Sequence, residues 1–398
     1  MNKLPNNPKN DGENRDYIDA LYQNASSKGT VSANNQVPPP PTLYDQLKAP
    51  LDTLLKSSKS VYSAGTELLH RINFSAIKIG EKNKDRILYR LQWHNLNSTR
   101  DLLAINARPT DLTIEQAILM GGINYEYQID SIKAAAGNYV QQAQMKAAIL
   151  QGAVLASTSR DEITEEDGQY QWNFLEGSET EVIAIQPELS TNLRQTELRT
   201  GFGASEPELR RLLGMPYNNL LLHLSTHGYF APQPADVQAK GISNDEGFKK
   251  FQLAKSQHPL VRTGVVLAGA NGVLNGEKIA GEVDGIWTGY EIAQNNLSKV
   301  PLVLIPNCHT GLGDLVSGEG AFSLPRAFKI AGTQYVIYGL WSVPDQQTKV
   351  FMTKFYKNWL GRTDRSVPAA FKETQKEMND GLNTSFDPYQ WASLMLLE

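Results

Sequence analysis

Cysteine is almost absent from this chain: its 398 residues contain one, Cys308. A single thiol cannot form a disulfide within the chain, and it cannot supply the set of thiolates that a cysteine-rich zinc site needs. Because disulfides belong to oxidising compartments, a chain that cannot form one internally fits the reducing cytoplasm, and we expect the protein there.

Long apolar runs and runs of one charge are also missing. No stretch approaches the roughly 20 apolar residues that a membrane-spanning helix needs. The first residues, Met1–Asn7, have no apolar core of a secretory signal. No basic run exceeds two residues, and the net charge is −4. We therefore expect no membrane partner and no direct binding of nucleic acid through a charged patch.

Large apolar side chains are scarce in residues 1–41, which are rich in Asn, Pro, Ser, Gly and Lys and include the run Pro38–Pro41. Such a segment buries too little surface to order itself, so we predict a disordered tail or linker. A docking peptide for a proline-recognising partner is the less favoured alternative, because one proline run is a weak signal.

The rest of the chain alternates short apolar runs with amphipathic stretches. This alternation predicts an α/β fold with a mainly parallel sheet covered by helices on both faces. Strands are expected at 88–93, 117–120, 219–224, 264–268, 300–305 and 334–340. Helices are expected at 44–55, 132–156, 204–214, 288–296, 323–332 and 348–360. Residues 60–74 read as a hairpin, and 157–171 and 231–259 as long polar loops, the first of them mobile.

Two of these strands deliver reactive side chains to the loops that follow them. The strand at 300–305 is followed by Cys308 and a glycine-rich bend, and the strand at 219–224 is followed by His227. Active sites of parallel sheets lie at the carboxyl ends of their strands, so the two residues are expected at the same edge. An imidazole can take the proton of a thiol and make it a nucleophile for acyl transfer. The backbone N–H groups of Gly228 and Cys308 are the candidate donors to the oxyanion of the tetrahedral intermediate.

Other interpretations of these residues remain open on the residues alone. A lone Cys at a strand end is most often a small buried apolar residue. His223 alternates with leucines and reads as a packed core histidine. His223 and His227 also have the i, i+4 spacing of a zinc pair, but Leu224 stands where that motif needs glutamate. On a strand four residues span about 13 Å, too far to share an ion. We expect no metal and no cofactor.

At these residues the sequence resembles the CHAT domain, a family of caspase-like cysteine peptidases related to separase, gingipain and caspases. The resemblance rests on an ordered series of motifs over roughly residues 58–397 rather than on one match. The series includes Leu68–Phe74, Ser98–Leu103, Ser225–Gly228, Val266–Asn271, Asp284–Thr288, Cys308–Gly313, Glu319–Phe322, Leu340–Asp345 and Pro388–Ala392.

The resemblance implies a caspase-like three-layer αβα sandwich. Its N-terminal half, here residues 42–200, would be a non-catalytic pseudo-protease half, and residues 201–398 would be the catalytic half. The resemblance also implies that Cys308 is the nucleophile, His227 the general base and Gly228 the oxyanion glycine.

The sequence departs from the family pattern around the nucleophile. Pro306-Asn307 stands where small residues usually precede the Cys, and His309 stands where a Glu usually follows it. These changes put Asn307 and His309 among the residues expected to contact substrate.

The resemblance suggests a basic side chain before the cut bond, held by Asp345 through a charge-assisted hydrogen bond. Trp341 would shape the pocket wall. A helix cap is the alternative role of Asp345, and Glu282 and Asp284 are alternative acids for the pocket.

These observations together predict a cytoplasmic cysteine endopeptidase that cuts a dedicated protein partner. The resemblance suggests a prokaryotic defence or cell-death pathway and control by a regulatory or sensor protein, because the chain shows no repeat of period 34. The loops at 157–171 and 231–259 are the candidate activation elements. The alternative is a non-catalytic adaptor that keeps the caspase fold to bind proteins.

Overall fold

The computed structural model describes residues 52–65, 67–80, 82, 84–107, 112–135, 163–166, 169–231, 256–275, 284–306, 313–316, 320–341, 343, 345–381 and 388–398. Its strands are β1 (Ser60–Ser63), β2 (Gln92–Asn95), β3 (Gln116–Ile123), β4 (Ile163–Glu166), β5 (Gln169–Trp172), β6 (Gln195–Gly201), β7 (Leu220–Leu224), β8 (Gly228–Phe230), β9 (Thr263–Val266), β10 (Ile286–Thr288), β11 (Leu302–Ile305), β12 (Gly313–Val316), β13 (Gly320–Ser323), β14 (Tyr335–Gly339) and β15 (Leu394–Leu397).

The α-helices are α2 (Asp52–Leu55), α3 (Ile87–Arg90), α4 (Asp101–Ala107), α5 (Ile129–Ala135), α7 (Glu176–Asn192), α8 (Glu206–Gly214), α11 (Ala270–Leu274), α12 (Gly289–Gln294), α13 (Leu324–Ile330), α14 (Asp345–Leu360), α15 (Val367–Asp380) and α16 (Pro388–Trp391). Short 3-10 helices are η3 (Glu67–Arg71), η4 (Phe74–Ala76) and η6 (Pro259–Val261). Within the described part of the chain, no helix combines the length and hydropathy needed to cross a bilayer.

The centre of the fold is a sheet in the order β1-β2-β15-β14-β11-β7-β3-β6. Its neighbours pair in parallel except β14 and β15, which are antiparallel. The five strands β14, β11, β7, β3 and β6 therefore run in one direction, and their carboxyl ends meet at one edge. Strands from both sides of residue 200 contribute to this sheet.

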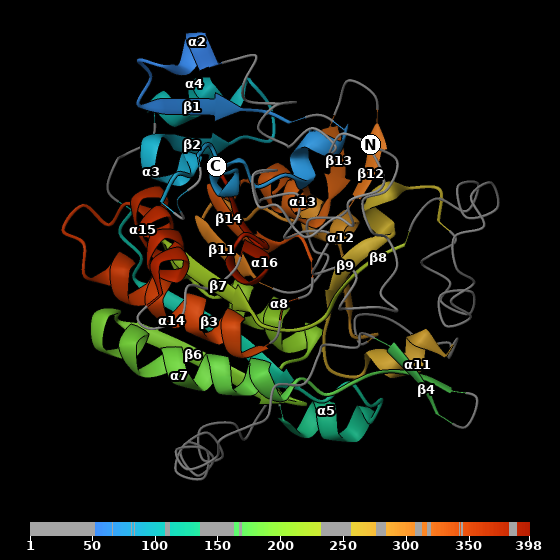
Figure 1. The fold of residues 1–398 in the computed structure, drawn as a ribbon. Coiled ribbons are helices and arrows are strands. Elements are labelled where there is room, and N and C mark those ends of the chain that lie inside the picture. The colour runs from blue at the N-terminus through green and yellow to red at the C-terminus, as the bar shows by residue number, and fades with distance from the viewer. Residues whose placement is uncertain are drawn as a thin grey trace, which may run out of the picture.

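Side chains of the central strands alternate between two cores, one on each face of the sheet. In β7, Leu220, Leu222 and Leu224 belong to the core beneath α8 and α13, whereas Leu221 belongs to the core beneath α7 and α14. The period of two is the direct consequence of strand geometry, and leucine on both faces is what a strand covered on both sides requires. Figure 1 shows α7 and α14 lying together on one face of the sheet. The predicted α/β sandwich with a mainly parallel sheet is confirmed.

Three local predictions are wrong. The strand expected at 88–93 is partly helical, because α3 covers Ile87–Arg90 and β2 begins only at Gln92. The expected hairpin at 60–74 is absent, because β1 pairs in parallel with β2 and the following residues form η3. Leu69 and Ile72 are three residues apart, a spacing that suits a helical turn as well as a strand, and the Ile72 N–H donates to the Leu69 carbonyl. The expected mobile loop at 157–171 contains β4 and most of β5, which form an antiparallel hairpin.

Other predictions fall partly or wholly on residues outside the described ranges. These are the tail at 1–41, the first part of the helix at 44–55, most of the helix at 132–156 and most of the loop at 231–259. The division of the chain at residue 200 into a pseudo-protease half and a catalytic half stays a prediction.

A buried polar cluster joins β7 to the two helices that cover it. His223 is fully buried. Its Nε2 lies 2.8 Å from Glu181 Oε1 on α7, and its Nδ1 lies 2.8 Å from the Tyr356 hydroxyl on α14. Burial, and then the charge of Glu181, raise the pKa of Tyr356, so its hydroxyl keeps its proton. The prediction that His223 is a packed core histidine is confirmed, and the ring also ties three elements together.

A second cluster fixes the start of α8, which connects β6 to β7. Arg210 donates to Glu206 Oε1 from Nε (3.0 Å) and Nη2 (2.6 Å), and the same Nη2 donates to Glu291 Oε1 of α12 at 3.0 Å. Asp284 forms a hydrogen bond with Glu206 and accepts one from the Ile286 N–H. Its carboxylate therefore stabilises the turn before β10. Three carboxylates thus surround one guanidinium. Burial first, and then repulsion from Asp284 and Glu291, raise the pKa of Glu206 to about 8 against the opposing effect of Arg210.

The Glu181→Ala substitution should destabilise the fold by about 3–5 kcal/mol, because it leaves a buried imidazole without its acceptor. Urea unfolding at pH 7 would measure this loss. The matched control is Glu188→Ala on the exposed side of the same helix, which should change the free energy of unfolding by less than about 0.5 kcal/mol. Equal effects of the two substitutions would contradict a structural role for the His223 cluster.

The Glu206→Gln substitution should stabilise the protein at pH 8 and have little effect near pH 4.5. The folded state holds a proton on Glu206 that the unfolded chain releases near pH 4.5. The free energy of unfolding therefore falls as pH rises from about 4.5 towards about 8. Gln mimics the protonated form, and the gain at pH 8 should be on the order of 2 kcal/mol. Urea unfolding between pH 4.5 and 8.5, with exposed Glu373→Gln as control, would test this. Parallel pH curves for the wild type and Glu206→Gln would rule it out.

Candidate active site

The carboxyl ends of the five co-directed strands bring several loops to one edge of the sheet. Beyond β3 lie Asn124 and Tyr125, beyond β7 lies His227, and beyond β14 lies Trp341. β11 lies between β7 and β14 and ends at Ile305, so the chain leading to Cys308 leaves the sheet at the same edge. This is the edge at which open parallel sheets carry their ligand and catalytic sites.

The residues that carry the chain from β7 to His227 are locked by hydrogen bonds. The Ser225 N–H donates to the Met120 carbonyl of β3 at 2.8 Å. The Thr226 hydroxyl donates to the Val266 carbonyl of β9 at 2.5 Å, and the Val266 N–H donates to the His227 carbonyl at 2.9 Å. The backbone of His227 is therefore fixed from both the large sheet and the small one.

The imidazole of His227 is buried, with 3% of the residue exposed. Its Nε2 lies 2.8 Å from the carbonyl oxygen of Asn173, three residues before the start of α7. A carbonyl oxygen can only accept, so Nε2 carries a proton and donates it. In the neutral ring the basic nitrogen is then Nδ1. The Asn173 carbonyl therefore selects the tautomer of His227.

Two aromatic rings flank this imidazole. The centroid of Tyr125 lies 5.1 Å from that of His227, and the centroid of Trp172 lies 5.2 Å away, with interplanar angles of 53° and 41°. The Tyr125 hydroxyl lies 2.8 Å from the Thr226 hydroxyl oxygen; since the latter donates to Val266, Tyr125 is the donor. Both centroid distances fall in the range where ring contacts stabilise each other, so His227 has a defined ring plane.

The amide of Gly228 is directed away from the strand next to it. β8 pairs with β9 in antiparallel fashion, with Gly228 opposite Val265. Because the preceding pair, His227 with Val266, is hydrogen-bonded, Gly228 and Val265 form the non-hydrogen-bonded type of pair. The Gly228 N–H therefore points to the side of β8 opposite β9, and β8 is the edge strand of the small sheet β10-β9-β8.

Of the other predicted site residues, the structure describes some and not others. Cys308, Asn307 and His309 lie outside the described residues. Asp345 is the first residue of α14, and its side chain is likewise outside the description. Trp341 is half-buried at the same edge as His227, and its Nε1 donates to the Tyr389 carbonyl of α16 at 2.9 Å. His227, Gly228 and Trp341 are therefore the predicted site residues whose side chains or main-chain groups the structure describes.

No described cluster of three His, Cys, Asp or Glu side chains is arranged to hold a metal ion. The two ring nitrogens of His223 are bonded to Glu181 and Tyr356, whereas His227 donates Nε2–H to Asn173. The two histidines thus serve separate networks.

Sequence reasoning missed Trp172, Asn173 and Tyr125. Trp172 is the last residue of β5 and Asn173 follows it, so both lie just beyond the segment expected to be a loop. A signal was present: the two residues between β4 and β5 are Asp167 and Gly168, the pair most typical of a two-residue hairpin connection. Tyr125 follows a predicted strand, as His227 and Cys308 do, but nothing local marks it.

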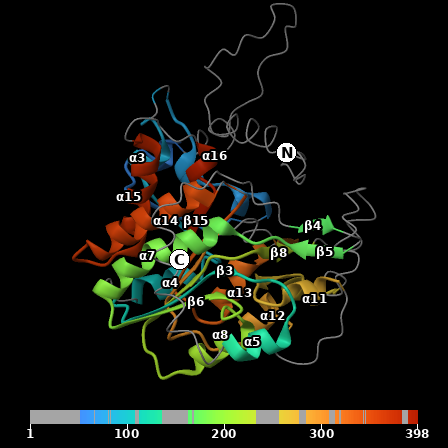
Figure 2. The same ribbon diagram turned by 90° about the horizontal axis from the view of Figure 1, so that it is seen from below.

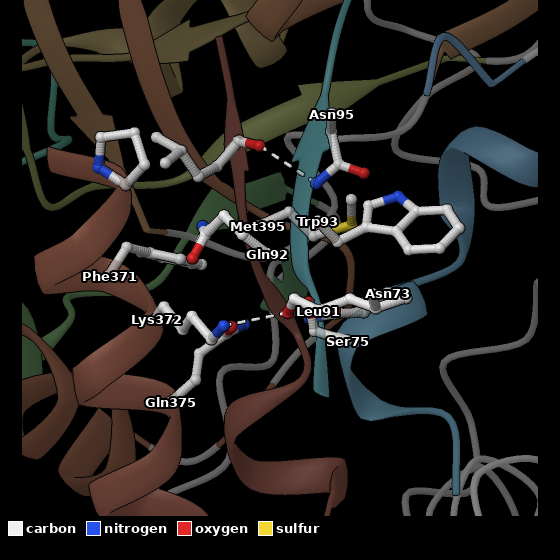
Figure 3. A pocket seen from close by; sticks show the side chains of 12 residues that line it. Asn73, Ser75, Leu91, Gln92, Trp93, Asn95, Phe371, Lys372, Gln375 and Met395 are labelled. Carbon is white, nitrogen blue, oxygen red and sulfur yellow. Dashed lines mark hydrogen bonds between the residues drawn. The ribbon is translucent and has the colours of Figure 1, made fainter. Parts of the chain in front are cut away.

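A polar hollow lies elsewhere in the molecule, between β2, α15 and β15 (Figure 3). β2 and β15 pair at one position, Leu397 with Asn95. Beside it Asn95 Nδ2 donates to the Leu396 carbonyl at 3.2 Å, and Lys372 Nζ donates to the Leu91 carbonyl at 3.0 Å. Side chains thus satisfy main-chain carbonyls where the two strands separate. None of the residues lining the hollow belongs to β7, β8 or β11, so it is distinct from the His227 site.

Comparison with known proteins agrees with this architecture. The family model of the CHAT domain matches residues 38–397. Tetratricopeptide repeat protein 28 of Homo sapiens is 37% identical over 82 residues, which cover 21% of this chain and 3% of that protein. The chain thus spans a small fraction of the length of this relative. CHAT domains are related to caspase-like peptidases. The family predicted from the ordered motifs is confirmed: the chain belongs to the CHAT domain family.

Proposed function

We propose that this protein is a cysteine endopeptidase in which Cys308 is the nucleophile and His227 is the general base. The observation that carries the proposal is the hydrogen bond from His227 Nε2–H to the Asn173 carbonyl. It leaves Nδ1 as the nitrogen that accepts a proton, and it holds the ring at the edge of the sheet where β11 ends. A histidine fixed in one tautomer by an acceptor is the usual partner of an activated nucleophile.

The register of the two strands supports the pairing with Cys308. β7 and β11 are parallel neighbours, and Leu304 lies opposite His223 at the last paired position. Cys308 and His227 each follow this position by four residues, since 304 + 4 = 308 and 223 + 4 = 227. Equal lengths of chain thus lead from adjacent strand ends to the two residues. The chain's single thiol and its fixed imidazole are therefore expected at comparable heights above the sheet.

The proposed reaction follows the chemistry of acyl transfer. His227 Nδ1 takes the proton of the Cys308 thiol, and the thiolate attacks the carbonyl carbon of the peptide bond. The backbone N–H groups of Gly228 and Cys308 donate to the resulting oxyanion, and the orientation of the Gly228 amide away from β9 suits this role. The imidazolium then gives its proton to the leaving amine, and water hydrolyses the thioester to release the acid and regenerate the thiol.

The proposed substrate is a protein partner, and the proposed location is the cytoplasm. A regulatory or sensor protein would control the activity, and the resemblance suggests a prokaryotic defence or cell-death pathway. The named relative is a tetratricopeptide repeat protein, and such repeats are modules that stack to build concave protein-binding surfaces. A partner carrying such a surface is one form the regulator would take.

The dyad predicts an unusual pH profile for alkylation of the protein by iodoacetamide. Because the chain has one cysteine, the rate reports on Cys308 without knowledge of the substrate. The midpoint of the rate against pH should lie well below about 8.5, the ordinary pKa of a thiol, since an imidazolium stabilises the thiolate. His227→Ala should return the midpoint to about 8.5 and lower the rate at pH 7 about tenfold.

The matched control is His258→Ala, a histidine of the η6 cap that contacts Tyr290 and should leave the profile unchanged. Identical profiles for the wild type and His227→Ala would refute the dyad. Cys308→Ala separates the enzyme from an adaptor: cleavage of peptides should vanish while binding of a protein partner persists. Cleavage that survives Cys308→Ala would refute the peptidase proposal.

We extend the proposal to the residue before the cut bond. Asp345 follows β14, the strand on the other side of β11 from β7, so its backbone lies on the loop side of the same edge. Its carboxylate would hold an Arg or Lys side chain, with Trp341, Asn307 and His309 as further substrate contacts. Because Asp345 also begins α14, a capping role alone is the competing account.

A peptide panel varied at the position before the cut bond would test the pocket. Peptides with Arg or Lys should be cleaved at least about tenfold faster than those with Gln or Leu, and Asp345→Asn should remove this preference by lowering kcat/KM for the basic peptides alone. The control Asp364→Asn removes another carboxylate, which is paired with Arg362 on the surface, and should leave selectivity unchanged. Equal cleavage of basic and neutral peptides by the wild type would disprove the role of Asp345.

A further inference from the structure

One residue, Asn271, ties the surroundings of His227 together. Asn271 is the second residue of α11 and is buried. Its Oδ1 accepts from the Trp172 N–H at 2.7 Å, and its own N–H donates to the Tyr125 carbonyl at 2.9 Å. Its Nδ2 donates to Glu126 Oε1 at 2.9 Å. A single side chain and its amide thus hold both aromatic residues that flank the imidazole.

Trp172 helps to position the imidazole of His227 in two ways. Its ring lies against one side of His227, and the carbonyl that accepts Nε2–H belongs to the next residue, Asn173. Trp172 is 2% exposed, so its position is set by packing within the protein. A displacement of the Trp172 backbone would move the ring contact and the hydrogen-bond acceptor together.

The element that carries Trp172 depends on this anchor. β4 and β5 form a two-stranded sheet of their own, separate from the large sheet, and β5 lies beside α11 (Figure 2). An isolated two-stranded hairpin is marginal in water and needs packing against another element. The hydrogen bond from Trp172 N–H to Asn271 Oδ1 is a polar link between the end of this hairpin and α11.

We propose that Asn271 and Trp172 are positioning residues for the general base: Asn271 fixes the end of the β4–β5 hairpin, and Trp172 then fixes the ring plane and tautomer of His227. This rests on the Cys308–His227 dyad proposed above. A general base is effective only when its accepting nitrogen is aimed at the proton it takes, and small misplacements lower the rate strongly.

The test uses the full chain and the alkylation profile of Cys308, because that profile measures the pairing of thiol and imidazole directly. Trp172→Ala and Asn271→Ala should each lower the rate at pH 7 about tenfold and move the midpoint up towards that of His227→Ala. Trp172→Phe, which keeps a ring beside the imidazole, should stay within about twofold of the wild type. The thermal midpoint of each variant identifies those that fold.

Two further sets of variants separate positioning from general loosening. Asn275→Ala removes the hydrogen bond from its Nδ2 to the main-chain carbonyl of Asn271 but leaves the side-chain bonds of Asn271 in place, and it should leave the profile unchanged. In the His227→Ala background, Trp172→Ala and Asn271→Ala should have no further effect, because they act through the imidazole. Where Trp172→Ala does not fold, Trp172→Leu and Asn271→Ala carry the test.

The outcomes distinguish this inference from the dyad itself. Wild-type profiles for both Trp172→Ala and Asn271→Ala, or equal losses with and without His227, would overturn the positioning role while leaving the dyad intact. A profile that does not respond to His227→Ala would overturn the dyad and with it this inference.

Discussion

The hydrogen bond from His227 Nε2 to the Asn173 carbonyl is the interaction on which the proposed role of His227 as a general base depends. A main-chain carbonyl has no proton to give and does not titrate, so it selects one tautomer of the ring at any pH at which the ring is neutral. The bond also joins two parts of the chain that are 54 residues apart, the end of β7 and the connection from β5 to α7. The state of the imidazole is therefore set by tertiary structure.

The layers of the fold keep this arrangement in place. β7 is covered on one face by α7 and α14 and linked to both through His223, and the Ser225–Thr226 segment beyond it is bonded to β3 and β9. The same helix α7 begins three residues after Asn173. The strand that leads to His227 and the helix that begins just after Asn173 are thus held by one buried polar cluster. Removing one member of such a cluster leaves a buried polar group without a partner and destabilises the fold. The members can therefore be replaced only together.

The strand-rich core could be predicted residue by residue, because burial on both faces makes β7, β11 and β14 continuous apolar runs that are bounded by turns. The hairpin β4–β5 was missed although Asp167-Gly168 signals it, because its strands are polar and the charged composition favoured a loop. β1 was given the wrong partner because strand pairing is decided at a distance: Ser60 pairs with Gln92, across two intervening 3-10 helices and α3. Local pattern identifies a strand more readily than it identifies the strand beside it.

The sequence by itself determined the α/β class, the two strands that end before His227 and Cys308, and the family to which the chain belongs. These follow from the period of hydrophobic residues and from the order of short motifs, both of which are local properties of the chain. Only the tertiary structure decided that Asn173 holds His227, that Tyr125 and Trp172 flank it, that Asn271 holds them both, and that His223 bonds Glu181 and Tyr356. The physical reason is that these contacts join residues far apart in sequence, and several use main-chain atoms, which every residue type provides.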